Sequence, residues 1–87
     1  MKIFNVCGNN GPVKNQFVIH DDYGNKIFQS YNAVIAKIDA RGNTILDNKY
    51  WDYSRTTGKY RNIFLRETKA ETEKKIKAGT YTLADLN

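Results

Sequence analysis

Four short runs rich in β-branched and aromatic residues occupy the first half of the chain, at residues 16–20, 26–31, 33–39 and 44–47, and residues 33–39 alternate apolar and polar positions toward their end. This alternation is the pattern of strands that bury one face. Turn-forming residues that include Gly24 separate the first two runs, and a second turn with Gly42 separates the last two. Residues 16–47 are therefore predicted to form two antiparallel β-hairpins.

The first fifteen residues carry a weaker pattern. Residues 2–6 fit one short strand, and residues 8–15 are rich in Gly, Asn and Pro. These residue types interrupt regular structure, because Gly tolerates positive φ and Pro lacks a backbone donor. Residues 1–15 are therefore predicted to be a short strand followed by a Gly/Asn/Pro loop.

Beyond residue 50 the aromatic residues recur at the spacing of a helix. Asp52 or Ser54 can cap the start of this helix, which is predicted to extend to about Arg66. Gly58 lies in its middle and costs about 1 kcal/mol relative to Ala. Residues 49–66 are therefore expected to be either one continuous helix or a strand followed by a helix.

A second helix is predicted by a capping box, in which Thr68 and Glu71 satisfy each other's backbone donors. Glu71 and Lys75 then form a favourable pair one turn apart. Gly79 is predicted to end this helix. Residues 48–87 are thus interpreted as a two-helix basic segment with a C-terminal tail.

Together these elements predict a single small α+β domain over residues 1–87, with an antiparallel sheet of about four strands followed by two helices. A chain of 87 residues has room for one hydrophobic core and none for a cofactor domain beside a substrate domain. A hydrophobic content of 40% and a charged content of 26% are ordinary for a folded globular protein.

Positive charge is concentrated in one segment of the chain. The net charge is +5, and residues 49–66 carry five cations against a single aspartate. At 100° per residue, four polar side chains of the predicted helix would form a stripe about 60° wide. The stripe consists of Arg55, Lys59, Asn62 and Arg66. This geometry suits a polyanion, because Arg forks phosphate or carboxylate groups; it is also the pattern of an ordinary solvated helix face.

The candidate contact residues are Arg55, Lys59, Arg61, Asn62 and Arg66, with Tyr50 and Trp51 as aromatic anchors. Arg and aromatic residues dominate binding hot spots, which favours them as contacts. The expected partner is a protein or nucleoprotein complex with an acidic groove. DNA or RNA, contacted mostly at phosphates with little sequence preference, is the other partner considered.

The residue types of the chain give little support to catalytic or metal chemistry, so no catalytic residue, metal or cofactor is expected. One Cys and one His are fewer than a structural zinc site usually requires. Neither a nucleophile elbow nor a phosphate-binding loop motif occurs. A small metal- or Cys/His-dependent enzyme is kept as an alternative, and its residues would be Cys7, His20, Asp21 and Asp22.

No membrane partner is expected either. The longest apolar runs are far shorter than the roughly 18 residues that a membrane-spanning helix needs. The first residues turn polar too early for a signal peptide, and a single cysteine cannot form an internal disulfide. These observations favour a cytoplasmic protein.

Residues 26–87 also resemble a known family. The matching segments are Phe28–Asn32, Ile35–Ile38, Leu46–Leu65 and Lys75–Asn87. They resemble a family of small uncharacterised proteins encoded by bacteriophages and mobile elements of Gram-positive and gut bacteria. The resemblance implies a location in the cytoplasm of the bacterial host. It also implies a role as an accessory factor that binds nucleic acid or as an inhibitor of host defence, in the manner of anti-CRISPR proteins.

The basic stripe and the resemblance together lead us to expect a non-catalytic binding protein. Its expected function is to modulate or inhibit a host nucleic-acid-processing or defence complex. A sequence-tolerant DNA- or RNA-binding accessory protein is the alternative, because the same stripe could contact phosphates directly.

Overall fold

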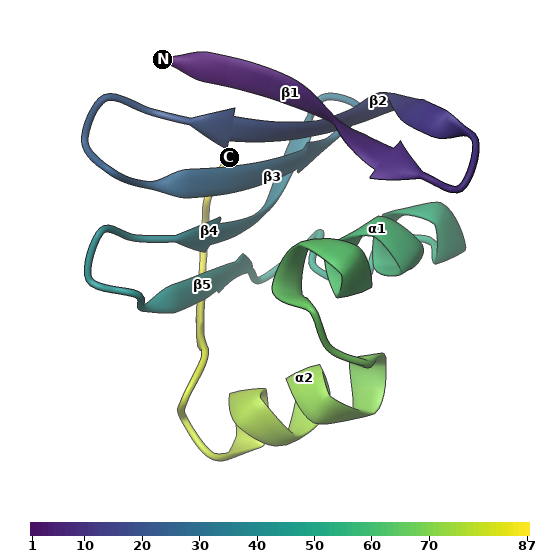
Figure 1. Ribbon diagram of the computed structural model, residues 1–87. Helices are drawn as coiled ribbons and strands as arrows, with labels where there is room; N and C mark the ends of the chain where they lie inside the picture. Colours follow the sequence, from purple (N-terminus) through teal and green to yellow (C-terminus); the bar gives the residue numbers. More distant parts are fainter.

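A computed structural model describes residues 1–87, and its six strands form one sheet that is covered on one face by helix (Figure 1). The elements are β1 (Lys2–Gly8), β2 (Gly11–His20), β3 (Lys26–Ser30), β4 (Ala33–Ile38), β5 (Thr44–Asp47), α1 (Arg55–Leu65), α2 (Lys69–Lys77) and β6 (Thr82–Ala84). The strands lie in chain order across the sheet; β1 to β5 pair antiparallel, and β6 pairs parallel with β5. The predicted small α+β domain is confirmed, but the sheet has six strands rather than about four and is mixed.

The two predicted hairpins are present as β2–β3 and β4–β5, and their turns share the sequence Asp-x-x-Gly-Asn. In the first turn the Asp21 carboxylate accepts hydrogen bonds from the side-chain and backbone N–H groups of Asn25, at 2.8 and 2.9 Å. Asp39 and Asn43 make the same pair of bonds in the second turn. These bonds lower the pKa of both aspartates below the usual value. Each turn is therefore specified within five residues of sequence.

The predicted loop at residues 8–15 is wrong, because this segment belongs to a third hairpin. β1 continues to Gly8 and β2 begins at Gly11, so that Asn9 and Asn10 alone form the turn. Gly11 has φ +101°, a conformation that L side chains rarely adopt. Neither Asn9 nor Asn10 has positive φ, so the turn is not of the mirror-image type; Gly11, directly after it, supplies the positive φ at which the second strand begins.

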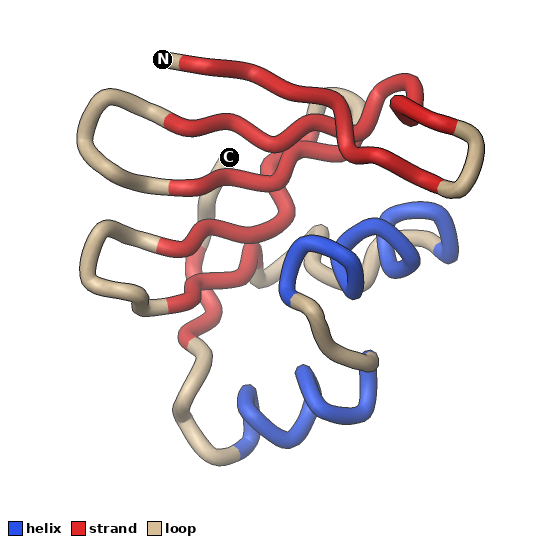
Figure 2. Tube along the Cα trace, in the orientation of Figure 1, coloured by secondary structure: helices blue, strands red, loops and turns tan.

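The C-terminal tail contains a strand that the sequence did not predict. β6 lies beside β5, with Leu83 opposite Leu46 in a parallel register. Figure 2 shows that both helices intervene in the chain between these two neighbouring strands. Parallel neighbours need such a crossover connection, whereas the other strands are joined by short turns.

The hydrophobic core lies between the sheet and α1. Phe28 of β3 is fully buried and stacks on Phe64 of α1, with ring centroids 5.7 Å apart. A register shift in β4 sets Ala36 opposite Phe28 and leaves Ile35 without a partner across the ladder. This extra residue allows Ile35 and Ala36, which are adjacent in sequence, both to be buried. The remaining fully buried core residues are Val6 and Leu46.

Both helices begin and end where local sequence signals place them. Ser54 caps α1 by accepting a hydrogen bond from the Thr57 N–H at 3.1 Å, and α1 continues through Gly58 without interruption. Arg66 ends α1 in the left-handed conformation, with φ 58°. The predicted capping box at Thr68 is confirmed at the start of α2. Residues 49–66 therefore contain one continuous helix, preceded by a turn rather than a strand.

Asp47 joins the end of β5 to the segments that precede α1 and follow β6. Its side chain is 1% exposed, and one carboxylate oxygen accepts from the Leu86 N–H at 2.8 Å and the Asn87 side-chain amide at 3.0 Å. The other oxygen accepts from the N–H groups of Lys49 and Tyr50, at 3.0 and 2.7 Å. Burial alone would raise the pKa of this carboxyl, but the four hydrogen bonds outweigh it and lower the pKa below the usual value.

We predict that Asp47→Asn lowers the free energy of unfolding by about 3 kcal/mol, because an amide NH₂ cannot accept from buried N–H groups. The wild-type carboxylate stabilises the fold above its unfolded pKa of about 3.9, and this contribution is lost as the pH falls through the lower folded pKa. The variant should therefore lose less stability than the wild type between pH 5 and 2. Urea unfolding across this range measures both effects.

The exposed Asp22 is a suitable control for this measurement, since Asp22→Asn removes a carboxylate that contacts only the N-terminal ammonium group. Its expected cost is below about 0.5 kcal/mol. Equal losses in the two variants would show that the bonds to Asp47 contribute no more than a surface contact.

Candidate anion-binding surface

Three residues of the polar stripe predicted from the sequence, Arg55, Lys59 and Asn62, lie on α1 and line one hollow, whereas the fourth, Arg66, is the left-handed C-cap of the helix; we call these four residues the basic stripe. Its three cations are exposed. None of them takes part in any of the four ion pairs of the protein. Lys59 has one weak internal contact, with its Nζ 5.4 Å from the centroid of the Tyr60 ring. The stripe therefore offers positive charge that the fold itself does not neutralise.

Asn62 completes the stripe with an oriented amide. Its Oδ1 accepts a hydrogen bond from Nη2 of Arg61 at 3.0 Å. No group within the protein accepts from its Nδ2, because Oδ1 is the only side-chain atom of Asn62 that makes a hydrogen bond. The amide can therefore donate to an anion or to a base edge placed against the stripe.

Arg61, next to Asn62 on α1, has a buried side chain and is only 1% exposed. Its Nη1 donates to the carbonyl of Trp51 at 2.7 Å and to Oδ1 of Asp52 at 3.2 Å. The guanidinium also lies over the Trp51 ring, 5.1 Å from its centroid. Arg61 thus attaches α1 to the preceding turn, and we leave it out of the proposed contact residues because a partner could not reach it.

The two proposed aromatic anchors are half-buried and pack against the hydrophobic core. Tyr50 meets Tyr53 edge to face, with ring centroids 5.6 Å apart. Tyr53 itself is 57% exposed and precedes the first cation of the stripe by two residues. Tyr53 is therefore the accessible aromatic ring of this turn, although it lines a different hollow from the stripe, while Tyr50 and Trp51 hold the turn against the core.

A polar hollow of about 580 Å³ lies against one edge of the stripe, and no hydrophobic residue lines it. The charged residues around it are Arg55, Lys59, Arg61, Lys69 and Asp52. Four cations against one carboxylate leave the hollow strongly positive. This excess extends the positive surface from α1 to the first residue of α2.

Asp52 is shared by two of these cations. Its carboxylate contacts Nη1 of Arg61 at 3.2 Å and Nζ of Lys69 at 2.7 Å. Partial burial acts to raise its pKa, but the hydrogen bonds from Lys69 and Arg61 outweigh burial and lower it. The hydrogen bond between Lys69 and Asp52 also raises the pKa of Lys69. Both groups are charged at neutral pH, so Asp52 offsets part of the positive charge of the hollow.

Lys69 is a residue of this surface that the sequence analysis missed, because only the packing of α2 brings it to Asp52. Glu67 fixes this packing: its buried carboxylate accepts from Thr72 Oγ1 at 3.0 Å, from Lys75 Nζ at 3.2 Å and from the Tyr81 hydroxyl. Burial and the bond to Glu67 raise the pKa of Tyr81. No sequence pattern of residues 67–81 indicated this cluster.

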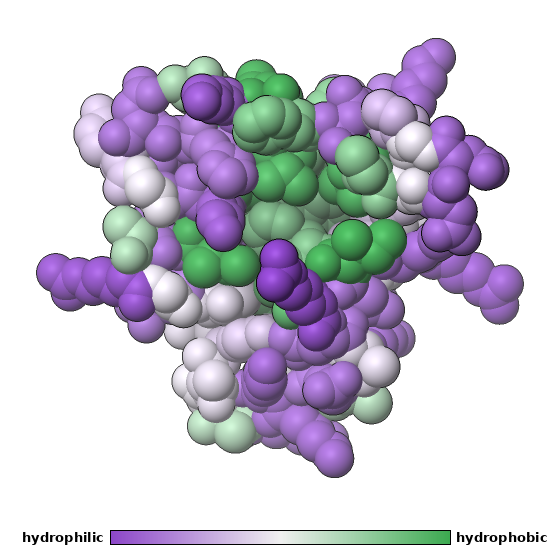
Figure 3. Space-filling view, in the orientation of Figure 1, coloured by the Kyte–Doolittle hydropathy of each residue, from purple (hydrophilic) through white to green (hydrophobic).

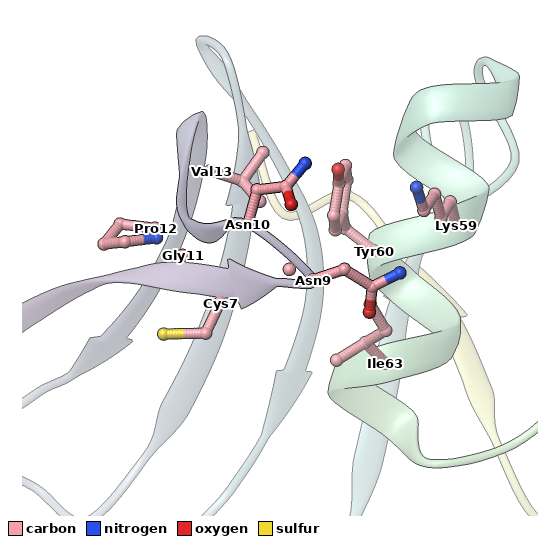
Figure 4. A pocket seen from close by; sticks show the side chains of 10 residues that line it. Cys7, Asn9, Asn10, Gly11, Pro12, Val13, Lys59, Tyr60 and Ile63 are labelled. Carbon is pink, nitrogen blue, oxygen red and sulfur yellow. The ribbon is translucent and has the colours of Figure 1, made fainter.

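The structure does not group the residues of the alternative metal or Cys/His site into a metal-binding cluster. No three His, Cys, Asp or Glu side chains are grouped so as to hold a metal ion. The Asp21 carboxylate accepts hydrogen bonds within its own turn. The His20 ring lies edge to face against the Phe4 ring, with the two centroids 5.5 Å apart. Figure 4 shows a separate hollow between the β1–β2 turn and α1, where Asn9 and Lys59 face each other and the Cys7 sulfur points away.

We predict that Arg61→Lys lowers the free energy of unfolding by about 2 kcal/mol, because an ammonium group cannot replace the forked bonds and the stacking on Trp51. Arg55→Lys, at an exposed position without partners, is the matched control and should cost less than about 0.5 kcal/mol. Urea unfolding of both variants makes the comparison. Equal stability of the two variants would contradict the buried role of Arg61.

Comparison with known proteins identifies the family and gives no further relatives. Neither curated proteins nor solved structures yield a match. No helix of the structure has the length and apolar character needed to cross a bilayer. One family model, described as a family of unknown function (DUF8033), matches residues 4–79. Because this match spans most of the chain, from β1 to the end of α2, the protein belongs to the DUF8033 family.

Proposed function

We propose that the protein acts without catalysis, by binding an anionic partner surface through the basic stripe of α1. The observation that carries this proposal is the set of three exposed cations on α1 and its C-cap, none of which has an acidic partner within the protein. Unpaired cations on one face attract a negatively charged partner and raise the rate of association. The free amide donor of Asn62 adds a directional contact in the same stripe.

The partner that we propose is a host protein or nucleoprotein complex that processes nucleic acid or acts in defence, with this protein as its modulator or inhibitor. The resemblance of residues 26–87 to small phage and mobile-element proteins supports this setting. The positive hollow beside the stripe supports it too, because an acidic surface would contact α1 and the start of α2 together. A small rigid domain is sufficient for such a role, since inhibition by occlusion needs contact area and no chemistry.

Direct binding of DNA or RNA is a second candidate, and the exposure of Tyr53 favours it. Tyr53 is exposed and precedes the first cation of the stripe by two residues, and proteins that bind single strands without reading sequence combine exposed aromatic rings, which stack bases, with cations that neutralise phosphates. The affinity of this mode falls steeply with salt, because each phosphate contact releases counterions.

The double variant Arg55→Glu/Lys59→Glu tests both candidates, and we predict at least a tenfold loss of binding, since it converts two attractions into repulsions. Lys14→Glu/Arg41→Glu is the control: it changes the net charge equally at exposed positions without ion pairs. Tagged wild type and both variants are used to capture partners from host lysate. Equal capture by the two variants would contradict the proposal.

Nuclease treatment of the lysate distinguishes the candidates. A protein partner that is retained after treatment supports the modulator, and a partner that is lost supports nucleic-acid binding. In the second case, a plot of the logarithm of affinity against the logarithm of salt concentration should be shallower in the double variant. The slope should differ by about 2, one unit for each lost phosphate contact.

Folding of the double variant is not expected to be impaired. The first turn of α1 contains no acidic residue, so Glu at position 55 would interact favourably with the helix dipole. We predict that Arg55→Glu alone raises the free energy of unfolding by about 0.5 kcal/mol. Thermal unfolding checks this prediction, and a marked loss of stability would mean that Arg55 has a structural role.

A further inference from the structure

An open apolar groove lies between the sheet and the C-terminal half of α1, separate from the polar hollow that Arg55, Lys59 and Asn62 line. We define the apolar groove by the hydrophobic residues Val6, Val18, Ile38, Ile63, Phe64 and Leu65 that line it. Its volume is about 530 Å³. Figure 3 shows this region as a concentration of hydrophobic surface at the centre of the face, with hydrophilic residues around it.

The groove exists because α1 ends before it covers the sheet. The helix stops at Leu65, and Arg66 turns the chain away in the left-handed conformation. The sheet extends beyond this point, where His20, Lys26 and Ile38 lie opposite one another on three neighbouring strands. Apolar side chains of both walls therefore remain in contact with water.

The exposure of individual side chains agrees with this description. Ile63 on the helix wall is 46% exposed, and Phe4 on β1 is 51% exposed. Phe4 adjoins the groove, because its ring contacts His20, which lines it. Contiguous exposed apolar surface with a polar rim is a feature of interaction sites rather than of ordinary protein surface.

The rim of the groove carries cations and no carboxylates. Lys26 and Arg66 line it, and neither forms an ion pair. Lys2 lies opposite His20, which in turn lies opposite Lys26, so a third cation stands at the same end. An occupant of this groove must therefore combine apolar groups with negative charge at their edge.

From this complementarity we infer that the groove binds an acidic amphipathic segment of a partner protein. Apolar side chains of the segment would contact Val18, Ile38 and Leu65, and its Asp or Glu residues would pair with Lys26 and Arg66. An open groove fits this mode of helix-in-groove recognition. Pockets for small ligands differ, since they enclose most of the ligand surface.

This inference deepens the proposed function and rests on it in one respect, that the partner is a protein. It specifies the part of the partner that reaches beyond α1 as an acidic amphipathic segment. Arg66 belongs to both surfaces, because it ends the basic stripe and lines the groove. A partner seated in the groove would place its acidic residues next to the last cation of the stripe.

The test uses a synthetic 18-residue amphipathic peptide with Leu on one face and Glu beside it, together with a version that carries Lys in place of Glu. Both are added to the ¹⁵N-labelled full chain. The Glu peptide should shift the amide resonances of Val18, Ile38 and Leu65, and the Lys peptide should bind at least tenfold more weakly. Equal binding of the two peptides, or shifts confined to the opposite face at Ile19 and Ile27, would overturn the inference.

Ile63→Asp is the decisive variant, because it sets a carboxylate on the helix wall of the groove at a position that is already half exposed. It should weaken binding of the Glu peptide at least tenfold, and Lys26→Glu should weaken it about fivefold. Ile3→Asp is the matched control, at a 60% exposed isoleucine of β1 that does not line the groove. A loss caused equally by the control would overturn the inference.

Other occupants give distinct results. A dimer of the free protein that Ile63→Asp dissociates would show that a second copy covers the groove, and palmitate that displaces the peptide would show a lipid site; either overturns the inference. Arg55→Glu/Lys59→Glu separates it from the proposed function. If that variant abolishes capture of the lysate partner while Ile63→Asp does not, the stripe functions without the groove and the inference alone fails.

Discussion

The position of α1 depends on one buried carboxylate, Asp47, which forms no ion pair. Asp47 accepts four hydrogen bonds from segments on either side of α1 and α2. Its own carbonyl accepts from the N–H of Trp51 at 3.1 Å, and the carbonyl of Trp51 then accepts from Arg61. The chain of contacts runs from β5 through one turn to the middle of α1. The orientation of both surfaces of the helix therefore depends on the hydrogen bonds that Asp47 accepts at the end of β5.

α1 presents two different surfaces because its sequence combines two patterns. The exposed cations recur along its solvent side, whereas Ile63, Phe64 and Leu65 stand together near its end and form one wall of the apolar groove. A longer helix would have covered more of the sheet. The end at Arg66 keeps the apolar wall open and sets a cation at its rim. The two surfaces are therefore adjacent, and one extended partner could contact both.

The sequence predicted those parts of the fold that are specified by neighbouring residues. The turns at Asp21 and Asp39 and the caps at Ser54 and Thr68 each depend on bonds within five residues. β6 could not be predicted in this way, because its three residues gain their pairing from a strand on the far side of two helices. The tight turn at Asn9 was missed for another reason: Gly and Asn are typical of loops and of two-residue hairpins alike.

For the candidate surface, too, the sequence predicted what depends on neighbouring residues and missed what depends on contacts between distant segments. Helical periodicity was sufficient to group the basic stripe, since those residues lie on one face of one element. It could not show that Arg61, one residue before Asn62, is directed into the protein and neutralised by Asp52, because that depends on the turn that precedes the helix. Nor could it bring Lys69 to Asp52, which requires the packing of a second helix.

The parallel strand also sets the order in which the protein can fold during synthesis. The four hairpins formed by β1 to β5 join strands that are adjacent in the chain, so they can pair as soon as they are made. Asp47 and Leu86 are separated by 39 residues, which at about 5–20 residues per second corresponds to about 2–8 s of synthesis. Throughout that interval β5 is an unpaired sheet edge, available to other strands in the cell. The nascent chain therefore keeps this edge open until β6, which follows both helices, has been made.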